Sequence, residues 1–270
     1  MKQKAKKLAV QAYKFSNSWT GTVIIVLLVI FFIAQAFRIP SGSMKYSLLV
    51  GDHLFAKKFA YGIATPHLPF LEISMTPWTD DLHLIDGDTP ERGDVVIFRY
   101  PKNPSLHFVK RCVGLPGDML FVNEKDLYLH PSEGDEFIIE NYPKEQIVEA
   151  FESLWVKNPY ASEHPGIHHD EAVVNDGTNH MPIFFVPPIK IPKDEYFMMG
   201  DNRDHSNDSR FWGTVPYENI EGTPWFVYFS IDDNYEIRWE RMGKTPTDLE
   251  GEAHIKRAAA EDTKKDKGIF

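Results

Sequence analysis

One uncharged stretch, from Trp19 to Phe37, limits most strongly how this chain can fold. Its centre, residues 23–33, is an unbroken run of aliphatic and aromatic side chains. Nineteen helical residues rise roughly 28 Å, which is close to the hydrocarbon thickness of a bilayer. Five lysines precede the stretch, and a basic flank stays on the cytoplasmic side of a membrane. The pattern predicts a basic cytoplasmic segment at 1–18 and one transmembrane helix over 19–37.

A cleavable secretory signal is the alternative interpretation of the same stretch. Such signals combine a charged N-terminal region, a short apolar run and small residues such as Ala34-Gln35-Ala36. The charged region is long for a signal, and cleavage after Ala36 would leave Ser41 and Ser43 on a loose new terminus. We therefore favour a retained anchor.

Charge and cysteine content argue against several other classes of protein. The formal net charge is −10 and no basic cluster follows the first residues, which argues against nucleic acid as a partner. The single cysteine, Cys112, excludes an internal disulfide framework and a cysteine-rich zinc site. We expect Cys112 to be a small apolar residue in a strand.

Strand patterns dominate the chain after the apolar stretch. RGDVVIFRYP, at 92–101, combines a Gly-Asp turn, a run of β-formers and a closing proline, and 107–118 shows a second such pattern. Periodicity alone predicts a mainly β globule. We divide it into a first core part at 38–121 with an extended loop or hairpin at 63–90, an inserted polar subdomain at 122–189, a second core part at 190–243 and a flexible tail at 244–270, with a loose helix as the alternative for the tail.

Ser41 and Ser43 lie on either side of Gly42, directly after the apolar stretch. A serine hydroxyl becomes an effective nucleophile only when a neighbouring group takes its proton. Residues 37–47 contain neither a histidine nor a carboxylate. A base for either serine must therefore come from a distant part of the chain.

Several histidines lie in the polar insert, namely His164, His168, His169 and His180. The prolines and glycines around them predict a surface loop rather than a catalytic setting. A metal site formed by HPGIHHD, at 164–170, is the less favoured alternative, because Pro165 and Gly166 interrupt any helix that would align ligands.

Lys110 is the other candidate base. Strand alternation puts it on one face with Phe108 and Cys112, a pattern that can turn its amine towards the interior. Burial among apolar groups lowers the pKa of a lysine by several units from about 10.4, which makes the neutral amine accessible. On periodicity alone, a lysine whose stem packs while its amine reaches water is the commoner case.

The segment GDNRDHSNDSR, at 200–210, gathers opposite charges around Ser206. Such a composition predicts an ion-paired, rigid loop that supports a site, with a solvated turn as the alternative. Its charged members are Asp201, Arg203, Asp204, Asp208 and Arg210.

Four segments, in order, resemble the successive motifs of the bacterial type I signal peptidase family: IPSGSM, RGDVVIFRYP, VKRCVGLPGD and GDNRDHSNDSRFWGTVP. Members of that family are membrane-anchored serine proteases with a Ser-Lys dyad. The resemblance extends from about Phe37 to Ser230, apart from the insert. It implies a catalytic core of coiled antiparallel β-sheets with the insert as a second β-rich subdomain. It also implies an endopeptidase that removes N-terminal signal peptides after Ala-x-Ala-like sites, through an acyl-enzyme.

The same resemblance implies a role for each matching residue. Ser43 would be the nucleophile and Lys110 the neutral general base, with Ser206 orienting the lysine amine. The Ser41 hydroxyl and the Ser43 backbone N–H would form the oxyanion hole. The remaining implied positions are Asp208 and Arg210 as an ion pair that holds the Ser206 loop, and Ile39, Pro40, Met44, Leu48 and Val109 as the lining of substrate pockets.

The implied partners are secretory preproteins and the lipid bilayer, with no nucleic acid, no cofactor and no metal. The implied location is the inner membrane, with the N-terminus cytoplasmic and the catalytic domain periplasmic or otherwise extracytoplasmic.

One loop departs from the family pattern. Residues 44–48 read Met-Lys-Tyr-Ser-Leu, whereas the family usually has proline and threonine at the positions of Tyr46 and Ser47. Many members also have two spans, and this sequence predicts one. Two other functions stay open: a catalytically silent, membrane-tethered binding module, and a serine-lysine protease of the self-cleaving repressor type, which lacks the span and the 200–210 loop.

Overall fold

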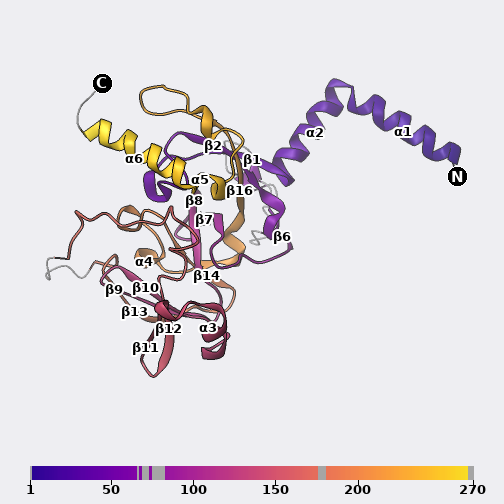
Figure 1. Cartoon of the computed structure of the whole chain (residues 1–270). Helices are drawn as coiled ribbons and strands as arrows, with labels where there is room; N and C mark the ends of the chain where they lie inside the picture. Colours follow the sequence, from indigo (N-terminus) through magenta and orange to yellow (C-terminus); the bar gives the residue numbers. More distant parts are fainter. Residues whose placement is uncertain (1, 66, 69–72, 75–82, 176–180, 267–270) are drawn as a thin grey trace.

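The body of the protein consists of antiparallel β-sheets, and two helices that precede it project away from the body (Figure 1). The computed structural model describes residues 2–65, 67–68, 73–74, 83–175 and 181–266. Most regular structure in the body is strand, so the mainly β class predicted from the sequence is confirmed.

The larger sheet has seven strands in the order β1-β2-β16-β7-β8-β14-β15. Alternate side chains of β7 explain its central place: Val95 and Ile97 join one hydrophobic cluster, while Val96 and Phe98 join another. An unbroken apolar run belongs in a sheet that is covered on both faces. The strands are β1 (Ala34–Arg38), β2 (Asp52–Lys57), β7 (Val95–Tyr100), β8 (Asn103–Gly114), β14 (Glu195–Met199), β15 (Val215–Pro216) and β16 (Ile220–Ser230).

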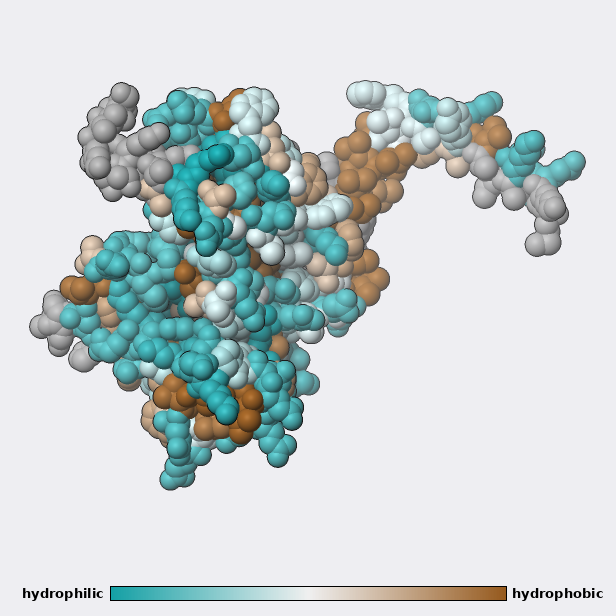
Figure 2. Space-filling view, viewed as in Figure 1, coloured by the Kyte–Doolittle hydropathy of each residue, from teal (hydrophilic) through white to brown (hydrophobic). Residues whose placement is uncertain are grey.

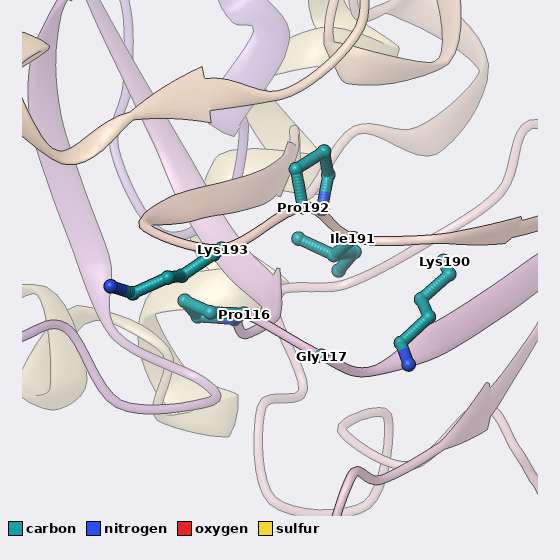
Figure 3. Close-up of a pocket in the computed structure, with 6 residues that line it drawn as sticks. All are labelled: Pro116, Gly117, Lys190, Ile191, Pro192 and Lys193. Carbon is teal, nitrogen blue, oxygen red and sulfur yellow. The ribbon is translucent and has the colours of Figure 1, made fainter.

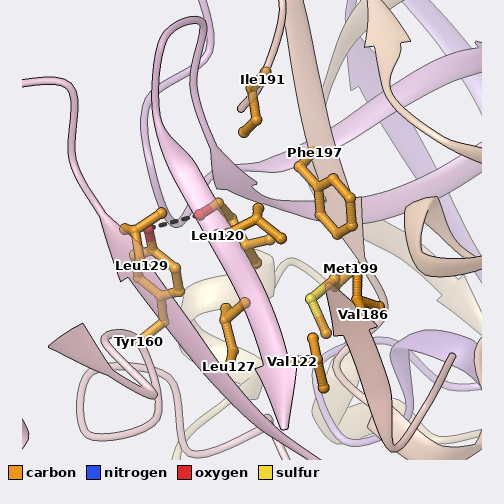
Figure 4. Close-up of a cluster of buried hydrophobic side chains, with 10 residues drawn as sticks. Leu120, Val122, Leu127, Leu129, Tyr160, Val186, Ile191, Phe197 and Met199 are labelled. Atoms are coloured by element: carbon orange, nitrogen blue, oxygen red, sulfur yellow. Dashed lines mark hydrogen bonds between the residues drawn. The ribbon is translucent and has the colours of Figure 1, made fainter. Parts of the chain in front are cut away.

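The smaller sheet has five strands in the order β11-β12-β10-β9-β13 and lies between Met119 and Lys190, where we expected the insert at 122–189. Its apolar side chains form one cluster with Phe197 and Met199 of β14, so a shared core joins the two sheets (Figure 4). Its elements are β9 (Met119–Asn123), β10 (Asp126–His130), β11 (Ile147–Ala150), β12 (Ser153–Lys157), β13 (Phe185–Lys190) and the helix α3 (Asp135–Asn141).

The chain passes between the two sheets at two neighbouring points (Figure 3). Gly117 N donates to Ile191 O at 3.0 Å, and Ile191 N donates to Asp118 O at 2.8 Å. A cavity of about 420 Å³ lies at this junction, lined by Pro116, Gly117, Lys190, Ile191, Pro192 and Lys193 (Figure 3). The paired backbones fix the insert against the core.

The N-terminal helices are α1 (Lys2–Ser16) and α2 (Trp19–Phe32). Ser18 is the N-cap of α2, since its Oγ accepts a hydrogen bond from Gly21 N at 3.0 Å. Residues 23–28 of α2 are each between 40% and 50% exposed, and the helix forms a continuous apolar surface (Figure 2). Among the described residues, no helix combines the length and the apolar composition needed to cross a membrane.

The helix predicted over 19–37 is wrong at its C-terminal end. It ends at Phe32, and the next residues form β1, which pairs with β2 from Ala34 opposite Lys57 to Arg38 opposite His53. A short apolar run does not distinguish helix from strand. Residues 34–38 form a strand because pairing with the edge of β2 satisfies the backbone hydrogen-bonding groups along that edge.

Two small sheets lie within the segment expected as an extended loop or hairpin at 63–90. Residues 66, 69–72 and 75–82 of that expectation fall outside the described residues. The pairs are β3 (Gly62–Ala64) with β6 (His83–Asp86), and β4 (His67–Leu68) with β5 (Ile73–Ser74).

The flexible tail predicted at 244–270 is wrong for its first residues. The helix α5 (Pro246–Leu249) begins with a capping box between Thr245 and Asp248, and Leu249 is fully buried. The helix α6 (Glu252–Asp266) follows. The charge-rich composition hid this order, because one buried leucine and one capped turn are enough to hold the segment against the core.

Candidate active site

Ser43 lies in a 3-10 turn, Gly42–Met44, which follows β1. Met44 is 2% exposed and anchors the turn in the core. The turn is also held from a distant loop, because Asn202 N donates to Ser43 O at 3.1 Å and Asn202 Nδ2 donates to Gly42 O at 3.0 Å. The serine turn is therefore held both by the core and by a distant loop.

Lys110 reaches Ser43 from β8. Its Nζ donates to Ser43 Oγ at 2.6 Å and to Val109 O at 3.0 Å, and it lies 5.4 Å from the centre of the Phe108 ring. The residue is 4% exposed, so the buried alternative for this lysine is the one observed. Burial lowers the pKa of Lys110 to about 8, with Asp208 partly opposing the shift. A neutral amine in this contact can accept the proton of a serine hydroxyl.

Asp201 links the lysine strand to the residues after the serine. Arg111 Nε and Nη2 each donate to its carboxylate at 2.7 Å, and Ser47 Oγ donates to it at 2.5 Å. Burial opposes the charged form, and the Arg111 guanidinium more than offsets that cost, so the pKa of Asp201 is lowered. Ser47 thus supplies a hydroxyl where the family usually has threonine.

Tyr46 adopts a backbone conformation with φ of 76°, which proline cannot reach. Its ring packs against His168 with the ring centres 4.3 Å apart. The departure from the family pattern at this position therefore changes the path of the loop as well as its side chain.

The 200–210 loop is ion-paired, as its composition predicts, and most of its charged residues are buried. Asp208 accepts from Arg210 Nε and Nη2 at 2.8 Å each and from Gly200 N at 3.0 Å, while Arg210 Nη2 also donates to Arg203 O at 2.6 Å. Burial opposes the charge of Asp208, but Arg210 holds its pKa below the usual range. The segment includes a 3-10 turn at Arg203–His205 and the short helix α4 (Ser209–Trp212).

Ser206 is 5% exposed, and within the described part of the chain its Oγ has no partner at hydrogen-bond geometry. It lies near enough to Asp208 to help lower the pKa of that carboxyl. The structure therefore brings Ser206 to the site without the contact to Lys110 that the resemblance implies.

A groove of about 550 Å³ runs past the serine and the lysine. Ser41 is exposed in it, with its Oγ 3.5 Å from Ser43 Oγ. The implied pocket residues that line the groove are Ile39, Pro40, Met44 and Val109. Leu48 differs: it is fully buried in the cluster beneath, with Leu54 and Leu249, and is not among the residues that line the groove, so its place in the pocket wall stays a prediction.

Sequence patterns missed several groove residues, among them His107, His205 and Asn207. His107 Nε2 lies 3.0 Å from Glu221 Oε2, and Arg99 Nε lies 2.8 Å from Glu221 Oε1. The only signal in the sequence was that His107 lies three residues before Lys110 and His205 next to Ser206.

The segment 164–170 is a loop, as predicted, with Pro165 and His169 exposed, but it also packs against the residues that follow the serine. Gly166 packs so closely on Ser47 that a side chain there would meet its Oγ at 2.3 Å, and His168 N donates to Asp201 O at 2.9 Å. His164 is only 19% exposed at its side chain. His180 lies outside the described residues, and among those described no group of three His, Cys, Asp or Glu side chains is placed to hold a metal.

Comparison of the sequence with known families identifies the class of protein as a peptidase. A family profile described as "Signal peptidase, peptidase S26" matches residues 13–229. The chain belongs to this family, and its enzyme class is that of a signal peptidase I.

Curated relatives named signal peptidase I cover most of the chain. Two from strains of Helicobacter pylori are each 44% identical over 273 residues, covering 88% of this chain and 94% of the relative. One from Pseudomonas aeruginosa is 36% identical over 234 residues, covering 82% of this chain and 73% of the relative.

Proposed function

We propose that this chain is a serine endopeptidase that removes signal peptides from exported preproteins after Ala-x-Ala-like sites. The observation that carries the proposal is the 2.6 Å contact between Lys110 Nζ and Ser43 Oγ beside the groove. The name of the relatives, signal peptidase I, supports the substrate class.

In the proposed acylation step, Ser43 Oγ attacks the scissile carbonyl while the neutral amine of Lys110 accepts the hydroxyl proton. Ser43 Oγ and Lys110 Nζ are 2.6 Å apart, so the proton can pass directly from the hydroxyl to the neutral amine. The negative oxygen of the tetrahedral intermediate accepts from the Ser43 N–H and the Ser41 hydroxyl, each worth about 3 to 4 kcal/mol at such sites. When the intermediate collapses, the C–N bond breaks and Lys110 returns the proton to the leaving amine.

Deacylation repeats the sequence with water. Lys110 takes a proton from water, the hydroxide attacks the ester carbon, and the Ser43 oxygen leaves with that proton. Ser206 is assigned to orient the lysine amine, and its buried position beside Gly200, which also packs against the Ser43 carbonyl, supports this role. The Asp208–Arg210 pair holds the loop that carries it.

The substrate is proposed to lie extended along the groove, where main-chain hydrogen bonds supply affinity. Ile39, Met44 and Val109 give the groove an apolar lining, which supports a preference for small apolar side chains such as alanine. Pro40 also lines this groove.

We further propose that the enzyme is held at the inner membrane through α2, with its N-terminus cytoplasmic and its catalytic body extracytoplasmic. The apolar surface of α2 and the lysines of α1 support this placement. The test is extraction of membranes with alkaline carbonate. Retention of the full chain in the membrane pellet is expected, and its recovery in the soluble fraction would refute the attachment.

Cleavage of a preprotein tests the catalytic proposal. Wild type is expected to release the mature protein, whereas Ser43→Ala and Lys110→Met are expected to lose turnover. Lys102→Met, at an exposed residue after β7, is the matched control and should cleave like wild type. Full activity in both Ser43→Ala and Lys110→Met would overturn the dyad, and a folded wild type that cleaves no Ala-x-Ala preprotein would favour a silent binding module.

A further inference from the structure

Glu250 follows α5 directly and is 4% exposed, although its segment has the composition of a solvated tail. Two features fix it there. Leu249 is fully buried in the cluster that includes Met44, next to the serine. The capping box of Thr245 and Asp248 holds the turn that carries both residues.

Both carboxylate oxygens of Glu250 meet donors from distant parts of the fold. Oε1 accepts from Arg111 Nη2, and Oε2 accepts from His164 Nδ1 at 2.8 Å. Burying a carboxylate is costly unless it is paired and hydrogen-bonded, and here both conditions are met. The three groups come from the C-terminal segment, the lysine strand β8 and the insert.

Arg111 is the centre of this arrangement. One side of its guanidinium is bound by Asp201, Nη1 donates to Gly93 O at 2.6 Å, and Glu250 occupies the remaining side through Nη2. Asp201 alone would suffice to pair the charge. The second carboxylate therefore restricts the orientation of the guanidinium, since bidentate and bridging contacts fix its plane.

Arg111 is connected to both reacting side chains, Lys110 and Ser43, through its neighbours in the fold. Arg111 follows Lys110 in β8, and its partner Asp201 accepts from Ser47 and precedes Asn202, which binds the backbone of Ser43. No step in this chain of contacts passes through solvent-exposed groups.

We propose that Glu250 is a positioning residue of the catalytic site: it holds Arg111, and through it the lysine strand and the serine turn, in register. The role rests on the proposed peptidase function. It acts on the transition state rather than on binding, because Glu250 does not contact the groove.

The test compares Glu250→Gln with Glu252→Gln in the full-length enzyme, using a preprotein in detergent micelles. Glu252 is exposed, two residues away, and pairs only with Lys256 among the described residues, at 2.8 Å. For Glu250→Gln we expect kcat to fall about tenfold, the scale of one charge-assisted contact, with KM within about twofold. Loss of the carboxylate also leaves Arg111 less neutralised, which should move the acid limb of the pH profile towards lower pH.

The outcomes separate a positioning role from a purely structural one. A wild-type kcat and pH profile in Glu250→Gln overturns the proposal, as does a loss of activity that follows the unfolded fraction with an unchanged pH profile. If Glu250→Gln melts below the assay temperature, the variant His164→Gln is used instead, because it removes only the second partner of Glu250. A kcat lowered about threefold in His164→Gln supports the positioning role, and a wild-type kcat overturns the proposal. Ser43→Ala in the same assay keeps the two questions apart, because its full activity would refute the peptidase function itself.

Discussion

The pH dependence of cleavage is the sharpest consequence of the buried lysine. Burial lowers the pKa of Lys110 to about 8. The neutral fraction of the amine is then about 1% at pH 6, about 9% at pH 7 and about 50% at pH 8. We expect kcat/KM to rise nearly tenfold from pH 6 to pH 7, to bend near pH 8 and to level off above about pH 9.

The same shift affects stability. Because the pKa in the folded state lies below that of the unfolded chain, protonation favours unfolding. The penalty is complete below about pH 8, shrinks as the pH rises towards 10.5, and is absent above that value. The shift from 10.5 to about 8 corresponds to about 3 kcal/mol. At pH 7 Lys110→Met should therefore be inactive and more stable than wild type, by up to about 3 kcal/mol.

The assay measures cleavage of a preprotein below its KM from pH 6 to pH 10, with melting temperatures of both enzymes at each pH. Lys102→Met should follow the wild-type curve. Cleavage that persists in Lys110→Met with an acid limb would refute the reasoning, because another group in the groove would then have to be the base. A destabilised Lys110→Met at pH 7 would refute the stability argument separately.

Two further substitutions test the support of the site by thermal melting and cleavage. Tyr46→Pro should lower the free energy of unfolding by about 2 kcal/mol or more and reduce cleavage, because proline cannot adopt a φ of 76°. Tyr46→Gly can adopt this backbone conformation and should lose less stability and less activity. An equal effect of the two substitutions would contradict the backbone explanation. Leu48→Ala should lower the free energy of unfolding by about 2 to 5 kcal/mol, because it leaves a buried cavity, while KM stays near the wild-type value. A raised KM with unchanged stability would instead place Leu48 in the pocket wall. Leu106→Ala, at an exposed leucine, is the control.

Local patterns in the sequence were sufficient for the central strands and for the face that Lys110 shares with Phe108, but not for the burial of its amine, since periodicity alone favoured an amine that reaches water. The run Val95–Tyr100 is apolar on both faces and forms a central strand, and the alternation around Lys110 correctly put Phe108 on the same side. Cys112 is fully buried in β8, as expected of a small apolar residue in a strand. These outcomes depend only on neighbours in the chain.

Local patterns could not predict contacts between distant residues. Ala34–Arg38 form a strand only because β2 offers an edge, and no feature of an apolar run reveals that partner. Leu48 matches a pocket position by motif, but the loop conformation at Tyr46 precedes it and the side chain packs below the groove. Glu250 looked like one charge among many, because its partners His164 and Arg111 are 86 and 139 positions away.

These separations also determine when the site can form. Ser43 and Lys110 are 67 positions apart, and the buried pair of Arg111 with Glu250 closes a span of 139. Contacts between distant residues form late, since loop closure must precede them. On a ribosome, a chain that has emerged only as far as α4 contains the serine and the lysine but lacks β16 and α5. The complete arrangement around Arg111 therefore arises only after nearly the whole chain has been synthesised.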